Sequence, residues 1–151
     1  MTGRPDGGPR GGIGAAEIDH VGIAVRDLES AVELYRSVLG AEPVHRERMD
    51  ADGVEEALFR VGGSYVQLLA PTGPETPVGR FLERRGEGVH HVGYRVDDVA
   101  EAVASLKEQG VPMVDDRPRP GSRGTIVAFA HPKGMGGVLV ELVQEGGRGD
   151  T

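Results

Sequence analysis

The first strongly patterned stretch of the chain is residues 18–25, in which β-branched residues alternate with polar and small ones. The three β-branched side chains after Ile18 fall on one side, and His20 and Gly22 fall on the other. This period of two is typical of a β-strand. After Asp27, a common helix N-cap residue, apolar positions recur at helical spacing as far as Gly40. The pattern therefore predicts a strand followed by a helix that ends at Gly40.

The same pattern occurs twice. The segment IDHVGIAVRDLESAV at 18–32 resembles VHHVGYRVDDVAEAV at 89–103, so that His20 corresponds to His91. A second pair of fragments, VQLL at 66–69 and VELV at 140–143, is related in the same way. Extended segments are expected after each helix, at 42–48, 53–61 and 64–70 in the first half and at 112–115, 123–130 and 137–143 in the second. The sequence thus predicts an α+β fold of two tandem β-α-β-β-β modules.

The boundaries of the modules follow from composition. The first module is expected over about 17–72 and the second over about 88–144, with a short linking helix over about 77–86. Residues 1–16 are rich in glycine and proline and are expected to form a disordered tail. Residues 146–151 are expected to be a flexible tail. One domain over 17–145 is therefore expected.

Composition excludes several kinds of protein. The 151 residues include 25 glycines and no cysteine, and the formal net charge is −7. Without cysteine the chain has no disulfide framework and no thiol nucleophile. The acidic balance argues against nucleic-acid binding, which needs clustered basic residues. No apolar run is long enough to span a bilayer, and the first residues do not resemble a signal peptide. We expect a cytoplasmic protein with neither a nucleic-acid nor a membrane partner.

Four polar side chains at repeated positions are candidate metal ligands. His20 and His91 are equivalent in the repeat, and each is followed two residues later by a glycine. Gln67 and Glu141 lie inside apolar strands, where a polar side chain needs a partner. If the modules pack about a pseudo-twofold axis to form a curved mixed sheet, the four can converge in one cleft. Two imidazoles, an amide oxygen and a carboxylate suit a divalent ion such as Co, Mn, Ni, Zn or Mg.

Other polar residues give weaker signals. His90 falls on the opposite strand face from His91 by alternation and ranks below it. Glu55 and Glu56 are adjacent in a predicted strand, and alternation does not decide which of the two is buried. Four basic residues could attract an anionic ligand, although scattered basic residues are usually surface groups: Arg46, Arg48, Arg123 and Lys133.

The paired modules resemble the vicinal oxygen chelate superfamily over about 18–144, and within it the methylmalonyl-CoA epimerases. The segments that carry this resemblance are IDHVGIAV, GVEEA, YVQLLAP, GEGVHHVGYRV and HPKGMGGVLVEL. The resemblance implies that His20, Gln67, His91 and Glu141 hold a divalent metal, with cobalt preferred. It also implies that Glu56 and Glu141 are the catalytic carboxylates, and that the protein is a homodimer.

The implied reaction interconverts the (R) and (S) forms of methylmalonyl-CoA by proton transfer at C2, through an enolate that the metal stabilises. Three alternatives share the scaffold. Lyases similar to glyoxalase I usually carry Glu where Gln67 stands. Extradiol dioxygenases use two His and one Glu to hold iron, and proteins similar to the bleomycin-binding proteins bind small molecules without a metal. If the protein resembles the methylmalonyl-CoA epimerases in function, an acyl-CoA substrate is expected.

Overall fold

The computed structural model describes residues 12–146, which form a mixed α+β fold with three α-helices in the described part. Contacts divide the chain into two compact units. We call His20–His91 the central unit, and the described residues of Met1–Asp19 and Val92–Thr151 the terminal unit. The division passes through two strands, β1 (Glu17–Ala24) and β5 (Gly88–Arg95), so each of these strands contributes to both units.

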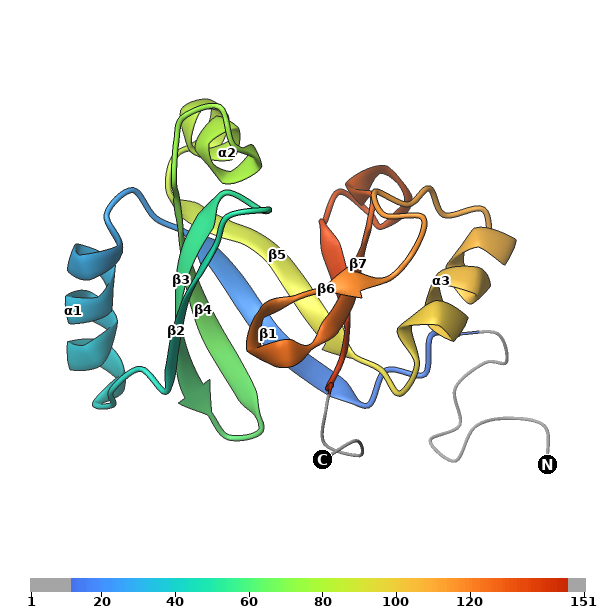
Figure 1. Cartoon of the computed structure of the whole chain (residues 1–151), viewed down its shortest axis with the longest axis horizontal. Helices are drawn as coiled ribbons and strands as arrows, with labels where there is room; N and C mark the ends of the chain where they lie inside the picture. The colour runs from blue at the N-terminus through green and yellow to red at the C-terminus, as the bar shows by residue number, and fades with distance from the viewer. Residues whose placement is uncertain (1–11, 147–151) are drawn as a thin grey trace. The chain divides into compact units, whose positions relative to one another are not determined.

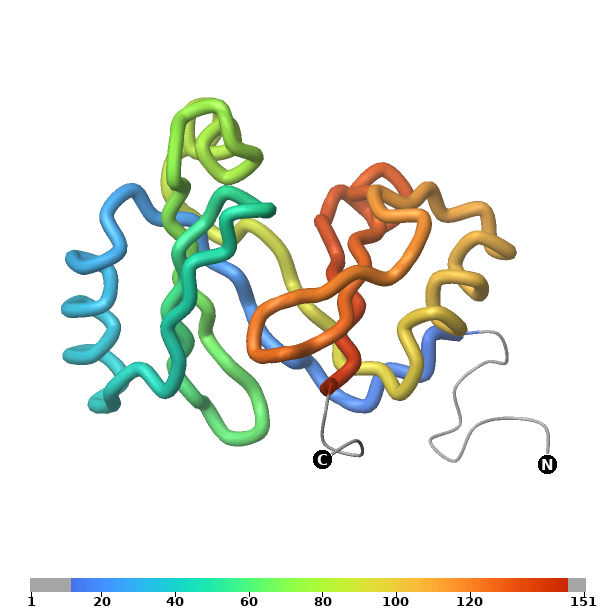
Figure 2. Tube along the Cα trace, viewed as in Figure 1, coloured from blue at the N-terminus to red at the C-terminus, as the bar shows by residue number. Residues whose placement is uncertain are grey.

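The central unit contains the first module. After β1 come α1 (Leu28–Leu39), β2 (His45–Met49), β3 (Val54–Val61) and β4 (Ser64–Pro71), and α2 (Pro77–Arg85) follows. The strands are ordered β2-β3-β4-β1. β4 is parallel to β1, and the other neighbours are antiparallel. Figure 2 follows this path as a trace, from blue through green.

The terminal unit repeats the arrangement. β5 is followed by α3 (Val99–Glu108), β6 (Arg119–Pro120), β7 (Ile126–Ala130) and β8 (Val140–Gln144), with short 3-10 turns at Ser122–Gly124 and Pro132–Gly134. The strand order β5-β8-β7-β6 and the parallel pairing of β5 with β8 match the first module. Among residues 12–146, strand pairing gives one order of eight strands, β2-β3-β4-β1-β5-β8-β7-β6. The predicted α+β class and the repeated β-α-β-β-β modules are confirmed.

The outer part of the second module differs from the prediction. Residues 112–115 form no strand; Met113 makes only an isolated bridge to Ala130. The carboxylate of Asp115 accepts a hydrogen bond from the Phe129 backbone N–H at 2.9 Å, so a side chain takes the place of a ladder bond. The paired strand β6 comes later, at Arg119–Pro120.

The last strand is also shorter than predicted. We expected strand from residue 137, but β8 begins at Val140. Gly136 and Gly137 have φ of +70° and +93°, a left-handed conformation that a strand cannot continue through. The glycine-rich segment therefore forms turns that follow the 3-10 turn at Pro132–Gly134, within the connection between the antiparallel strands β7 and β8.

In the central unit, the two helices pack on opposite faces of the strands (Figure 1). α1 packs through a cluster that includes Ala31, Val32, Phe59 and Leu68. α2 packs through Val78 and Leu82 on a second cluster that includes Ala24, Val54 and Leu69. Alternation along the strands produces this division, because neighbouring residues such as Leu68 and Leu69 point to opposite faces. The functional residues described below share the face of Ala24, Val54 and Leu69.

In the terminal unit, α3 packs on β7 and β8 through one apolar stripe. Val99, Ala102, Val103 and Leu106 contact a cluster of buried strand residues at the i, i+3, i+4 and i+7 positions of the helix. Asp98 caps this helix, because its carboxylate accepts a hydrogen bond from the Glu101 N–H at 3.1 Å.

The chain before β1 contacts the terminal unit. Ile13 packs against its apolar cluster, and the Ala16 N–H donates to the Arg95 carbonyl at 2.9 Å, although a disordered tail was predicted to extend to residue 16. The rest of that predicted tail, 1–11, and residues 147–151 of the predicted C-terminal tail lie outside the described residues. Among the helices of the described part, none is long and apolar enough to cross a membrane.

Candidate active site

The candidate site of the central unit is built on rows of side chains that cross its strands. Strand register places Gly22 (β1) beside Gln67 (β4), Gln67 beside Leu58 (β3), and Leu58 beside His45 (β2). The next row runs from Ala24 through Leu69 and Glu56 to Glu47. All these side chains lie on the face opposite α1, because residues two apart on a strand share a face. Three polar residues of this face are buried: His20, Glu56 and Gln67.

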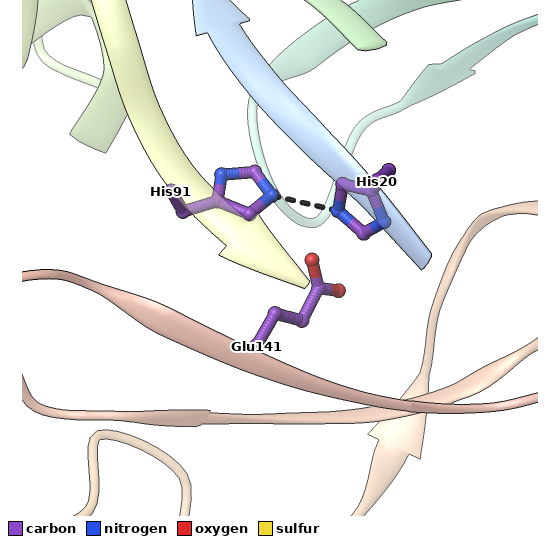
Figure 3. A group of neighbouring side chains, drawn as sticks. All are labelled: His20, His91 and Glu141. Carbon is purple, nitrogen blue, oxygen red and sulfur yellow. Dashed lines mark hydrogen bonds between the residues drawn. The ribbon is translucent and has the colours of Figure 1, made fainter. Parts of the chain in front are cut away.

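Two histidines from β1 and β5 meet at the centre of this site. His20 Nε2 lies 2.9 Å from His91 Nε2, and the side chains are 4% and 3% exposed. The rings are almost perpendicular, with centroids 5.0 Å apart. Figure 3 shows the two ring nitrogens directed at each other. The pairing predicted from the repeat, His20 with His91, is therefore present in the central unit.

Gly22 makes room for this arrangement. A Cβ atom at Gly22 would lie 2.3 Å from His91 Cε1 and 2.9 Å from Gln67 Oε1. Both distances are shorter than any real contact to a Cβ atom, so only glycine fits here without displacing a side chain. The absence of a side chain at Gly22 allows the imidazole of His91 and the amide of Gln67 to approach the same point.

Gln67 contacts a buried carboxylate. Its Nε2 donates to Glu56 Oε1 at 2.6 Å. Its Oε1 is buried and has no hydrogen-bond partner among the described residues. A buried amide oxygen without a partner costs free energy, which a cation bound at that oxygen would offset. Gln67 therefore offers its oxygen to a ligand and its nitrogen to Glu56.

The structure decides between the two adjacent glutamates. Glu56 is 1% exposed and Glu55 is 48% exposed. Glu55 pairs with Arg48 at 3.6 Å on the surface. Glu56 shares its face with the histidines, whereas Glu55 points to the other face. Only Glu56 lies beside Gln67 and is placed for chemistry at this site.

Two residues of β2 complete the surroundings of Glu56. His45 Nε2 lies 2.8 Å from Glu47 Oε1 and 3.8 Å from Glu56 Oε2. Each of these three residues offers one atom that could bind a metal, and these three atoms lie within 4.8 Å of one another. His45 and Glu47 were not among the predicted site residues. The sequence signal that could have identified them was their spacing of two residues on a strand. Only the register of β2 on β3 shows that His45 lies opposite Leu58 and that Glu47 lies opposite Glu56.

His90 also has a place near the site. Its Nδ1 lies 2.9 Å from His91 Nδ1, although strand alternation places the two side chains on opposite faces. Its ring contacts Phe81 of α2 edge to face, with centroids 4.9 Å apart. His90 was ranked below His91 as a ligand because alternation places it on the other strand face, and this ranking stays a prediction.

Glu141 belongs to the terminal unit. It is 8% exposed and lies on β8, where strand register places it beside Gly93 of β5 and Phe129 of β7. Gly93 lies beside Glu141 on the neighbouring strand, just as Gly22 lies beside Gln67. The repeat therefore extends to the register of Gln67 and Glu141.

Three of the basic residues considered as anion-binding groups pair with carboxylates. Arg46 pairs with Glu29, and Arg48 with Asp50 at 2.7 Å. Arg123 pairs with the fully buried Asp19 at 2.8 Å. Lys133 is exposed. These contacts make Arg123 part of the internal structure of the terminal unit.

The donors of the central unit fit a divalent cation. His20 Nε2 and His91 Nε2 lie 2.9 Å apart, close enough for both to bind one ion whose bonds to imidazole nitrogen are about 2.0–2.1 Å long. The unpartnered Gln67 Oε1 adds an oxygen donor near His91. Imidazole nitrogen together with amide oxygen suits borderline ions such as Co²⁺, Mn²⁺, Ni²⁺ and Zn²⁺.

Comparison with known proteins adds a family and its members. A family model described as the Glyoxalase/Bleomycin resistance protein/Dioxygenase superfamily matches residues 19–129. The mitochondrial methylmalonyl-CoA epimerase of Bos taurus is 37% identical over 145 residues, which are 95% of this chain and 82% of that protein. The ethylmalonyl-CoA/methylmalonyl-CoA epimerase of Cereibacter sphaeroides is 39% identical over 84% of this chain and 96% of its own length.

Solved structures agree with these relatives. A methylmalonyl-CoA epimerase in complex with methylmalonyl-CoA and NH4+ is 42% identical, with a TM-score of 0.84 over 87% of this chain and 95% of that chain. A variant of Streptomyces coelicolor methylmalonyl-CoA epimerase in complex with 2-nitronate-propionyl-CoA is 41% identical, with a TM-score of 0.85 over 88% of this chain and 99% of that chain.

Proposed function

Because the chain belongs to the Glyoxalase/Bleomycin resistance protein/Dioxygenase superfamily, we propose that it is a metal-dependent epimerase that interconverts the (R) and (S) forms of methylmalonyl-CoA. The observation that carries the proposal is the position of Gln67. Its amide oxygen is free for a cation beside the two histidines, and its amide nitrogen holds the buried carboxylate of Glu56. The Gln67 side chain thus supplies a candidate metal donor and also donates a hydrogen bond to a buried carboxylate.

The proposed metal ligands are His20, His91, Gln67 and Glu141. The first three are in the central unit, and their geometry supports them directly. Glu141 is supported by strand register: it lies beside Gly93, which follows His91 by two residues on β5 and shares its face. When bound, a divalent cation supplies positive charge that stabilises negative charge developing on the thioester oxygen of the substrate.

Glu56 is the proposed base at C2 of the substrate. Gln67 Nε2 donates to one carboxylate oxygen at 2.6 Å and fixes the orientation of the group. The second oxygen, which lies 3.8 Å from His45 Nε2, is the proposed proton acceptor. Glu141 returns a proton to the opposite face of the same carbon. Removal and return on different faces invert the configuration, and they need no redox cofactor.

The named relatives support the substrate class. Both sequence relatives described above are named as epimerases of methylmalonyl-CoA, and one of the solved structures contains methylmalonyl-CoA itself. Homodimer formation, a cytoplasmic location and cobalt as the preferred metal stay predictions.

The first test follows the proton. Incubation of the protein with methylmalonyl-CoA in deuterium oxide, with Co²⁺ supplied, should place deuterium at C2 as the two epimers equilibrate, and mass spectrometry and proton NMR would measure it. Exchange no faster than in the absence of protein would exclude the proposed reaction.

The second test separates catalysis from metal binding. We expect Glu56→Gln to lower kcat by a factor of roughly 10²–10⁴, the usual contribution of a general base, while the metal content stays that of the wild type. Glu55→Gln is the matched control, because that carboxylate is one residue away and exposed. Equal activity of the two variants would show that Glu56 is not the base.

A further inference from the structure

We propose that His90 is a positioning residue for the metal site: its Nδ1 accepts a hydrogen bond from His91 Nδ1–H and so directs the His91 Nε2 lone pair at the cation. This inference rests on the proposed function, because it takes His91 as a metal ligand. It adds a residue that acts through His91 rather than as a ligand itself.

The contact between the two rings is unusual for neighbours on a strand. Successive side chains point to opposite faces of a sheet, yet the two Nδ1 atoms are 2.9 Å apart. The rings stand nearly perpendicular, at 87°. The Nδ1 atom lies on the backbone side of an imidazole, so both rings turn this side toward each other. His91 then presents its far nitrogen, Nε2, to His20.

The protons on the rings follow from the chemistry of a metal ligand. A neutral imidazole carries one proton, on either Nδ1 or Nε2. If His91 Nε2 holds a cation, the proton of that ring is on Nδ1, and the Nδ1–H needs an acceptor. His90 Nδ1 is within hydrogen-bond distance and is an acceptor when the His90 proton is on Nε2. One interaction thus fixes both the tautomer and the ring orientation of His91.

The linking helix holds His90 in place. Phe81 of α2 contacts the His90 ring edge to face, at 80° and 4.9 Å. Phe81 packs against the apolar cluster of Val78 and Leu82, and the Arg85 guanidinium lies 5.9 Å from its ring centroid. The helix itself begins at a cap in which Thr76 accepts from the Gly79 N–H at 3.1 Å. The helix between the two modules therefore supports a side chain next to a metal ligand.

The test measures metal affinity rather than turnover. Purified protein stripped of metal is titrated with Co²⁺, and binding is followed by calorimetry and by the visible absorption of the ion. His90→Leu removes the acceptor, and we expect it to weaken binding about 10–100-fold, the usual effect of losing such a partner. His90→Asn places an amide oxygen near the former Nδ1, and we expect it to retain most of the affinity.

His131→Leu is the matched control. It removes a histidine that is exposed on the surface, so this variant and His90→Leu have the same number of histidines for non-specific binding. We expect its Co²⁺ affinity to equal that of the wild type. Phe81→Leu should weaken binding less than His90→Leu does, because it loosens His90 without removing the acceptor. Circular dichroism of each variant checks that it is folded.

The outcomes separate this inference from the proposed function. If the wild type binds no Co²⁺, the metal-dependent mechanism and the role of His90 both fail. If the wild type and His90→Leu bind Co²⁺ with equal affinity, only the role of His90 fails. If His90→Asn loses as much affinity as His90→Leu, ring packing rather than the hydrogen bond is responsible, and the proposal is overturned.

Discussion

At the scale of single residues, Gly22 has a strict steric requirement in the central unit. Its backbone φ is not in the left-handed region, so the constraint is space rather than backbone conformation. A methyl group there would lie within 2.9 Å of atoms of both His91 and Gln67. The nearest atoms belong to proposed metal ligands, so relief of the clash has to move one of them.

We therefore expect Gly22→Ala to lower the affinity for Co²⁺ by at least about tenfold, as other changes that misplace a ligand do. Calorimetric titration with Co²⁺ measures this. Gly73→Ala is a suitable control, because the added methyl group would meet only the end of the flexible Glu75 side chain. Unchanged affinity in Gly22→Ala would mean that the two ligands are not held where the structure places them.

At the scale of elements, the helices of the two modules begin differently. Asp27 and Asp98 occupy equivalent N-cap positions of the repeat, and because aspartate is a preferred N-cap residue, both are expected to cap the helix that follows. Asp98 accepts a hydrogen bond from a backbone N–H of α3 at 3.1 Å. Asp27 makes no such bond to α1; its carboxylate accepts from the Ser30 hydroxyl at 2.5 Å instead. The expectation is confirmed for Asp98 and wrong for the side chain of Asp27, because a nearby hydroxyl competes with the backbone donors.

This difference predicts unequal effects of the same substitution. Asp98→Ala should lower the free energy of unfolding by about 1 kcal/mol, the usual value of an N-cap. Asp27→Ala should lower it by less than about 0.5 kcal/mol, as is common for an exposed position without a cap bond. Urea denaturation followed by circular dichroism gives both values, and a larger loss for Asp27→Ala would contradict this reading of the caps.

At the scale of the whole molecule, one buried ion network joins segments that are far apart in the chain. Asp19 of β1 is fully buried, and its carboxylate accepts hydrogen bonds from Arg95 at 2.8 and 3.0 Å and from Arg123 at 2.8 Å. Burial disfavours the charge of Arg95, but the hydrogen bonds and charge of Asp19 outweigh it, and the pKa of Arg95 is raised above its ordinary value. The resulting stabilisation is present at every pH below the ordinary pKa of arginine and is lost only as the pH rises through the raised value.

Removal of the shared carboxylate should destabilise the terminal unit strongly. Asp19→Ala leaves two guanidinium groups without their buried partner, and breaking a buried pair in this way costs about 3–5 kcal/mol. Glu17→Gln, which removes a more exposed partner of Arg95, should cost less than about 1 kcal/mol. Thermal and urea unfolding of the two variants test this contrast. Similar losses for both would show that burial does not set the value of these pairs.

Most of the elements were predictable from the sequence. The alternation at 18–25, the helical stripe from Leu28 to Leu39 and the left-handed Gly40 that ends it all depend on residues close together in the chain. The repeat identified His20 and His91 as equivalent, and α2 was expected at Pro77–Arg85, where it occurs. These features follow from local backbone geometry, which repeats every two residues in a strand and every 3.6 in a helix.

Only the tertiary structure decided which neighbours each side chain has. It buried Glu56 and exposed Glu55, placed His45 and Glu47 beside Glu56, and turned the His90 ring to His91 Nδ1. These choices depend on strand register, which is fixed by packing between distant segments and leaves no local periodicity in the sequence. The sequence therefore determined where most of the strands and helices are and which histidines correspond, and long-range packing determined which side chains surround them.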